Sequence, residues 1–303
     1  MVIRNNKKER ARDGIRERED KTKKVGSFPY IWKSISRNPN AVGGLVILSF
    51  IIIMSFLSPY IMKHDFARVD MLMRFAKPSL EHPFGCDQFG RDIMVRVFYG
   101  ARYTLAIGLG ATALAAVCGV LIGSLAGFFG GILDNIIMRI IDVVQSFPFM
   151  ILAIAMAAVF GQGLENCIYA IGISLIPVFA RLIRANIFAI RSSEFIEAAT
   201  SIRCSTARII FKHVLPNSIS PIIVQISMSI ATAGLGAASL SFLGLGVKEP
   251  HPEWGIMISS ARGFMRDYPH VVIVPGIFIM ITVLSLNLIG DALRDALDPK
   301  LKD

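Results

Sequence analysis

Long apolar blocks alternate with short polar connections along most of this chain. The six blocks lie at residues 41–62, 104–128, 136–160, 164–183, 219–240 and 271–289. A helix rises about 1.5 Å per residue, so a block of about 20 residues crosses the roughly 30 Å hydrocarbon core of a bilayer. The pattern therefore predicts an all-α membrane protein with six transmembrane helices.

A polar and basic segment, residues 184–217, separates the fourth and fifth blocks. Ser193 and Ser205 are suited to cap two short helices, Glu194 complements the positive end of the first helix, and Pro216 is expected to end the second. The predicted helices carry an apolar stripe made of Phe195, Ala198, Ala199, Ile209, Ile210 and Val214. We expect a soluble partner protein to cover this stripe. The alternative is an amphipathic connector that lies flat on the membrane.

Charge is concentrated at the start of the chain, whose formal net charge is +10. Residues 1–38 form a basic tail with 12 Lys and Arg against 5 Asp and Glu. The positive-inside rule therefore predicts a cytoplasmic N-terminus, and six spans bring the C-terminus to the same side. The tail either contacts anionic lipid headgroups or is simply solvated. The rest divides into residues 39–103, with the first span and an outer loop, and a core at 104–303.

Candidate catalytic chemistry is absent from the sequence. No phosphate-binding G-x-x-x-x-G-K-[ST] motif occurs, so the chain is not expected to hydrolyse ATP itself. The sequence also has no H-E-x-x-H pair, and its four cysteines are widely separated. We therefore expect no enzyme activity, no metal site and no cofactor bound by this chain.

Polar side chains inside the apolar blocks are the candidates for gating or for a transport pathway, because buried ionisable groups are costly in a membrane. Arg139 and Asp142 stand three residues apart and could pair on one helix face, either as a gate or in contact with a substrate. Gln145, Gln225 and Met228 either line the pathway or pack between helices.

The outer loop carries a compact motif of glycines and charges at Gly85, Asp87, Gly90, Arg91 and Asp92. These residues suit an ordered turn that leads into a short amphipathic helix at 93–102. The turn either contacts an extracellular protein or braces the bundle. Residues 248–270, in which Trp254 is expected at the membrane interface, allow the same two interpretations.

Several motifs carry a resemblance to a known family. Glu197-Ala198-Ala199, Ile210 and the sequence HVLPN at 213–217 resemble the EAA motif of ABC-importer permeases. The sequence HPFGCDQFGRD at 82–92 resembles the outer-loop marker of dipeptide, oligopeptide and nickel permeases. SFLGLGV at 241–247, PEWG at 252–255 and the segment 287–299 are similar to the C-type subunit of that family.

The resemblance implies a type I ABC importer (MetI-like) permease bundle in a bacterial or archaeal cell membrane. It implies that residues 184–217 form a coupling loop seated in a cleft of an ATP-binding subunit. The residues expected to dock there are Glu197, Ala198, Ala199, Arg203, Arg208, Ile210, Lys212, His213, Leu215 and Pro216. Expected partners are a B-type permease in a heterodimer, two cytoplasmic subunits that bind ATP and magnesium, and an extracellular peptide-binding protein.

Di- or oligopeptides are the implied cargo, and nickel or a nickel chelate is the main alternative. An ion-coupled secondary transporter is a rival without ATPases, but the sequence shows no internal repeat that would favour it. The chain also departs from the family pattern at Arg203, where the EAA motif has glycine. Arg203 is therefore expected either to adopt a positive φ angle at some cost or to sit in a rebuilt turn.

Overall fold

The structure, a computed structural model, describes residues 28–62 and 65–297. The basic tail at 1–27 lies outside these residues. Apart from one isolated bridge between Cys86 and Asp92, the regular elements of the described residues are helical. The α-helices are α2 (Phe28–Arg37), α3 (Pro39–Ile61), α4 (Ile93–Phe129), α5 (Gly131–Gln145), α6 (Phe149–Phe160), α7 (Leu164–Arg191), α8 (Glu194–Ser201), α9 (Thr206–Ile209), α10 (Leu215–Asn217), α11 (Ile219–Phe242), α12 (Trp254–Ala261) and α13 (His270–Leu297). Two 3-10 turns, η1 (Met71–Met73) and η3 (Arg262–Phe264), and one π-helix, η2 (Ile210–Val214), complete the set.

Five described helices, α3, α4, α7, α11 and α13, are long and apolar enough to cross a membrane. They match the first, second, fourth, fifth and sixth predicted spans. The prediction of a continuous third span at 136–160 is wrong, because α5 and α6 meet at an angle of 88°. Pro148 lies in the break, directly before α6, and proline both lacks an N–H and disfavours a helical conformation in the residue before it. Counting the bent pair as one span gives up to six.

Helix α4 begins earlier than predicted and has 37 residues. The separate short helix predicted at 93–102 is wrong, because these residues form the first turns of α4. Asp92 caps the helix by accepting a hydrogen bond from the amide of Val95 at 3.0 Å. The helix ends at Gly130, and Gly130 and Gly131 have φ angles of 63° and 58°, which glycine adopts without steric cost. These two residues turn the chain directly into α5.

The core of the bundle is the contact of α4 with α7. A side chain at Gly119 would come within 2.4 Å of the Cβ of Phe179, and one at Gly123 within 2.4 Å of the carbonyl oxygen of Ala180. Small residues at these positions let the two backbones approach closely, as is common between helices in lipid. α11 packs against both helices, and Ala233 and Ala237 join the same buried cluster.

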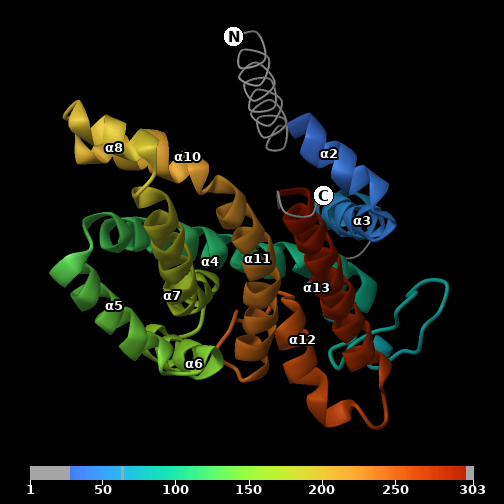
Figure 1. Cartoon of the computed structure of the whole chain (residues 1–303). Helices are drawn as coiled ribbons and strands as arrows, with labels where there is room; N and C mark the ends of the chain where they lie inside the picture. The colour runs from blue at the N-terminus through green and yellow to red at the C-terminus, as the bar shows by residue number, and fades with distance from the viewer. Residues whose placement is uncertain (1–27, 63–64, 298–303) are drawn as a thin grey trace.

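The short helices α8 and α10 lie together at one side of the molecule (Figure 1). α2 and the end of α13 lie towards the same side, where Ile35 and Ala292 share a small buried cluster. α12 lies at the opposite side (Figure 1). Both ends of the described chain therefore lie on the side of the molecule that carries the segment at 184–217.

Candidate coupling surface and transmembrane site

The predicted starts of the two short helices in segment 184–217 match the structure. α8 begins at Glu194, and the Ser193 carbonyl accepts hydrogen bonds from the amides of Ile196 and Glu197. α9 begins at Thr206, directly after Ser205. The prediction that Pro216 ends the second helix is wrong, because Pro216 lies inside α10 and only Ser218 separates α10 from α11.

A π-helical turn accommodates this proline. The amide of Leu215 donates to the carbonyl of Ile210, five residues earlier. Pro216 has no N–H to continue an α-helical ladder, and π turns insert one extra residue where such a ladder is disturbed. The chain thus passes from α9 to the start of α11 as an almost continuous helical segment.

The apolar stripe of this segment packs inside the chain. Ala199, Ile209 and Val214 are buried in one cluster with Ile183 and Ile187 of α7. Ile210 is also buried, whereas the side chains of Phe195 and Ala198 lie outside those that the structure describes. The expectation that the stripe needs a soluble partner is therefore wrong for the described members. The reason is that α7 continues to Arg191, eight residues beyond the predicted span, and supplies the apolar surface.

A different face of the segment is open. The predicted docking residues Glu197, Arg203, Arg208, Lys212 and Pro216 are exposed, and His213 and Leu215 are half-buried. Two large apolar side chains of the same segment are also open, with Ile202 76% and Phe211 61% exposed. The sequence analysis missed both, because it assigned the apolar contact to the opposite stripe. Their position on either side of Arg203 and Arg208 could have identified them.

Arg203 adopts the positive φ angle that was one of its two expected outcomes. Its φ angle is 57°, and the amide of Cys204 donates to the carbonyl of Ala199 at 3.1 Å. This six-residue bond is typical of a helix C-terminus in which the residue after the cap is left-handed. A residue with a Cβ in this conformation costs about 1–2 kcal/mol. The turn is therefore retained with mild strain and is not rebuilt.

Two ion pairs join α5 to α7. Asp134 accepts hydrogen bonds from Nε and Nη2 of Arg184 at 2.5 and 2.6 Å. Asp142 accepts one from Nη2 of Arg181 at 2.5 Å. The expected pairing of Asp142 with Arg139 is wrong, and the exposed Arg139 forms no ion pair with any residue that the structure describes. Arg181 is 39 residues from Asp142, and spacing within one helix cannot show a contact between helices.

The other predicted pathway residues lie apart from this pair. Gln145 is exposed at the end of α5, and Met228 is 38% exposed on α11. The half-buried Gln225 donates to the hydroxyl of Ser229 at 3.0 Å, one turn along the same helix. This local bond fits a packing role for Gln225.

The outer-loop motif forms a buried network. Asp87 accepts hydrogen bonds from the amide of Phe89, from the amide of Arg91 at 2.9 Å and from Nε of Arg91 at 2.6 Å. Nε of Arg96, on α4, lies 3.5 Å from the same carboxylate. Asp92 contacts Nδ1 of His82 at 2.7 Å while it caps α4. The network joins the loop at 82–92 to the start of α4.

Close backbone approach explains both glycines of the motif. Gly85 and Gly90 have φ angles of 75° and 70°. A Cβ at Gly90 would come within 1.7 Å of the Asp70 carbonyl oxygen. Between them, Cys86 is buried, and burial together with the nearby Asp92 raises the pKa of its thiol to about 12. The thiol is therefore protonated at neutral pH, which makes it a poor nucleophile or metal ligand.

Helix α12 is anchored by two buried side chains. Trp254, expected at the membrane interface, is instead fully buried, and its indole N–H donates to the carbonyl of Val97 at 2.8 Å. Glu253 caps α12 by accepting from the amide of Ile256 at 3.1 Å, and it accepts from the hydroxyl of Thr104 at 3.2 Å. Complete burial raises the pKa of Glu253 although these hydrogen bonds oppose the shift.

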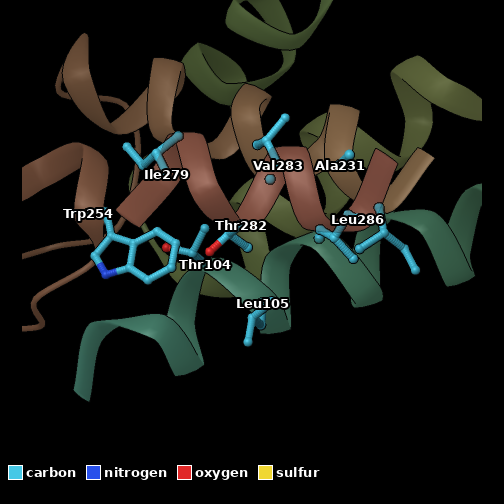
Figure 2. Close-up of a pocket in the computed structure, with 11 residues that line it drawn as sticks. Thr104, Leu105, Ala231, Trp254, Ile279, Thr282, Val283 and Leu286 are labelled. Atoms are coloured by element: carbon cyan, nitrogen blue, oxygen red, sulfur yellow. The ribbon is translucent and has the colours of Figure 1, made fainter. Parts of the chain in front are cut away.

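A narrow pocket between α4, α11 and α13 lies beside Trp254 (Figure 2). Figure 2 shows the hydroxyl groups of Thr104 and Thr282 among otherwise apolar side chains. The lining residues are Thr104, Leu105, Gly108, Ile230, Ala231, Gly234, Trp254, Ile279, Thr282, Val283 and Leu286. The sequence analysis named none of them as pathway residues, because they come from helices far apart in the sequence. The pocket is narrow and mostly apolar, which fits a packing defect between helices better than a binding site.

Comparison with known proteins identifies the family. Residues 119–303 match the binding-protein-dependent transport system inner membrane component. The chain belongs to this family. Residues 28–78 match the N-terminal transmembrane domain of oligopeptide transport permease C, so the resemblance to C-type permeases is confirmed. The protein is a multi-pass membrane permease, as the sequence predicted.

Relatives of this permease match over nearly their whole length. It is 43% identical to the dipeptide transport system permease protein DppC of Alkalihalophilus pseudofirmus over 284 residues, which cover 94% of this chain and 93% of the relative. It is 43% identical to the glutathione transport system permease protein GsiD of Pectobacterium atrosepticum, with 89% and 90% covered. GsiD of Escherichia coli O157:H7 is 44% identical, with the same coverage.

The fold of the permease also matches a solved structure. An inward-facing structure of the MetNI methionine ABC transporter has a TM-score of 0.57 at 20% identity and covers 68% of this chain and 98% of the matched chain. The expected MetI-like fold is therefore confirmed at the level of a helical permease bundle.

Proposed function

We propose that this permease is one half of the membrane pore of an ATP-driven importer of di- or oligopeptides. The observation that carries the proposal is the 43% identity, across 94% of the chain, to a dipeptide transport permease. The other named relatives transport glutathione, which is itself a peptide. The dipeptide permease and the glutathione permeases thus share a peptide as cargo.

The topology that fits this role has six spans, with the bent pair α5 and α6 counted as the third. The N- and C-termini and the coupling loop at 184–217 lie in the cytoplasm, in agreement with the basic residues of 1–38. Residues 39–103 provide the first span and the outer loop, and residues 104–303 form the permease core. In this orientation the buried Asp87 network is extracellular, and its burial favours a bracing role over direct contact with a receptor.

The assembly that we propose has a B-type permease beside this chain, two ATP-binding subunits on the cytoplasmic side and a peptide-binding protein outside. ATP and magnesium bind to the ATPase subunits, and this chain supplies no catalytic group. Ile202 and Phe211 provide apolar contacts on the ATPase, and Glu197, Arg208 and Lys212 are exposed charges of the same segment. Because only Ser218 separates α10 from α11, movement of the docked segment passes directly to α11.

Uptake measurements test the cargo. The complete importer and its binding protein are reconstituted in proteoliposomes, and uptake of a labelled dipeptide, of glutathione and of nickel is compared. Dipeptide uptake that requires ATP supports the proposal. The ATP is supplied inside or outside the proteoliposomes, on whichever side the ATPase subunits face. Uptake of nickel without uptake of either peptide would show that the cargo is the metal and not a peptide. Peptide uptake that continues without ATP and stops when the ion gradient is removed would instead indicate a secondary transporter.

Substitution of Glu197 tests the coupling surface. Glu197→Lys reverses an exposed charge on α8, and we expect it to lower both peptide uptake and receptor-stimulated ATP hydrolysis. Glu165→Lys is the matched control, because Glu165 is also an exposed carboxylate in the first turn of a helix but lies at the other end of α7. Normal transport by Glu197→Lys would show that the docking role assigned to this residue is wrong.

A further inference from the structure

The two ion pairs between α5 and α7 differ in their number of hydrogen bonds and in the exposure of their side chains. Asp134 and Arg184 share two hydrogen bonds, and the Asp134 side chain is only 6% exposed. Asp142 and Arg181 share one hydrogen bond, and their side chains are 49% and 46% exposed. The first pair is therefore a closed structural contact, whereas the second is open to its surroundings.

The open pair does not suit a lipid environment. Arg181 lies 17 residues into α7, which is about 26 Å along a helix that is long and apolar enough to span the bilayer. Exposed charges in such a helix face water or other protein, because contact with hydrocarbon is costly. Arg181 lies past the middle of α7, in the half that continues towards α8.

A polar stripe on α5 continues from the pair. Asn135, Arg139, Asp142 and Gln145 recur at helical spacing and are all exposed. Asn135, Arg139 and Asp142 also line an open hollow along this helix. Three isoleucines and a methionine of α5 line the same hollow, so the polar stripe lies within a mixed polar and apolar surface.

We propose that Asp142 and Arg181 bind the charged ends of a peptide as it passes through the permease. The proposal rests on the peptide importer function above and deepens it. The Asp142 carboxylate binds the terminal ammonium of the peptide, and the Arg181 guanidinium binds its terminal carboxylate. A zwitterionic peptide thereby breaks the ion pair. Its ammonium replaces Arg181 as the partner of Asp142, and its carboxylate replaces Asp142 as the partner of Arg181.

The geometry allows this exchange. In the part of the chain that the structure describes, one hydrogen bond holds the two side chains together, so one carboxylate oxygen and the remaining guanidinium donors are available to a ligand. The side chains also lie on different helices. α5 is bounded by the glycine turn at Gly130–Gly131 and by the 88° bend before α6, which are places where its orientation can change.

Direct binding tests the proposal without the receptor's own selectivity. The complete importer, without its binding protein, is placed in lipid nanodiscs, and binding of tritiated dialanine, N-acetyl-dialanine and dialanine amide is measured. We expect the wild-type importer to bind dialanine about tenfold more tightly than either blocked form, because each blocked form loses one charge-assisted hydrogen bond.

Each single variant should lose the preference for dialanine over one blocked form and keep the preference over the other. Asp142→Asn should abolish the preference for dialanine over its N-acetyl form and retain the preference over the amide. Arg181→Gln should do the reverse. Asp134→Asn is the matched control, and it should lower thermal stability while all preferences are retained.

Three results would overturn the proposal. These are no binding of dialanine by the wild type, an equal change for all three ligands in both variants, or loss of the second permease subunit from the Asp142 and Arg181 variants. The last result would mean that the open pair faces the neighbouring subunit. Receptor-dependent dipeptide uptake is measured in parallel with the wild type. If that uptake is absent the peptide function itself is wrong, whereas normal uptake without the expected loss of one preference in each variant contradicts only the site.

Discussion

Asp87→Asn should destabilise the permease, because Asp87 is the anion of a buried cationic site. Its carboxylate contacts Arg91 at 2.6 Å and Arg96 at 3.5 Å, and both arginine side chains are at most 4% exposed. Breaking a buried ion pair typically costs about 3–5 kcal/mol, since the remaining charge lacks a partner. Here Arg91 keeps Glu249 at 3.6 Å as a second, weaker partner. Asparagine retains an oxygen for the amides of Phe89 and Arg91. We therefore expect a loss near the lower end, about 3 kcal/mol.

Thermal unfolding of the purified complex, followed by intrinsic fluorescence, measures this loss. At about 2–4 °C per kcal/mol for a chain of this size class, the midpoint should fall by roughly 6–12 °C. Glu81→Gln is the matched control, because Glu81 is an exposed carboxylate in the same loop. An unchanged midpoint together with weaker binding of the receptor protein would refute the bracing argument and assign Asp87 to the receptor interface.

Three further substitutions follow from backbone geometry and burial. Gly90→Ala should lower the unfolding midpoint far more than Gly131→Ala, because both residues have positive φ but a Cβ at Gly90 meets the Asp70 carbonyl at 1.7 Å while Gly131 has no atom within 4 Å. Arg203→Gly should stabilise α8 by up to about 1 kcal/mol, seen as slower hydrogen exchange, whereas Arg203→Ala should not, because alanine retains the Cβ. Glu253→Gln should remove a pH dependence of stability. Burial raises the pKa of Glu253, so the folded chain holds a proton that the unfolded chain releases, and wild-type stability falls as pH rises through the raised pKa. The midpoint of the variant should therefore exceed that of the wild type by a margin that grows from about pH 5 upward, and a constant margin would contradict this assignment.

Hydropathy was sufficient for the long helices, because a membrane-spanning segment must satisfy its backbone hydrogen bonds internally. The same reasoning failed at 136–160, where the segment is apolar enough for a span but Pro148 interrupts the helix. It also failed to extend α4 back to Ile93, because the start of this helix is stabilised by the Asp92 cap and by the contact of Arg96 with Asp87 in the outer loop. Apolar length therefore predicts which segments form helices long enough to cross a membrane, but not where these helices begin or bend.

Local chemistry was predicted better than contacts between helices. The starts of α8 and α9 and the positive φ angle considered for Arg203 depend on neighbouring residues, and the sequence contained them. The partner of Asp142 and the surface that buries Val214 both come from α7. Helical spacing predicts contacts within one helix, and α7 is too far along the chain for that spacing to indicate these contacts. The exposed face with Ile202 and Phe211 could be recognised only after the opposite face was seen to be covered.

The length of α4 has a consequence for the membrane around the protein. Its 37 residues form a rod of about 55 Å, nearly twice the thickness of the hydrocarbon core. Such a rod fits a bilayer only if it tilts strongly or projects from it, and its tilt must respond to bilayer thickness. Since α4 carries the close contact with α7 at Gly119 and Gly123, the acyl-chain length of the surrounding lipid should bias the angle between these two helices.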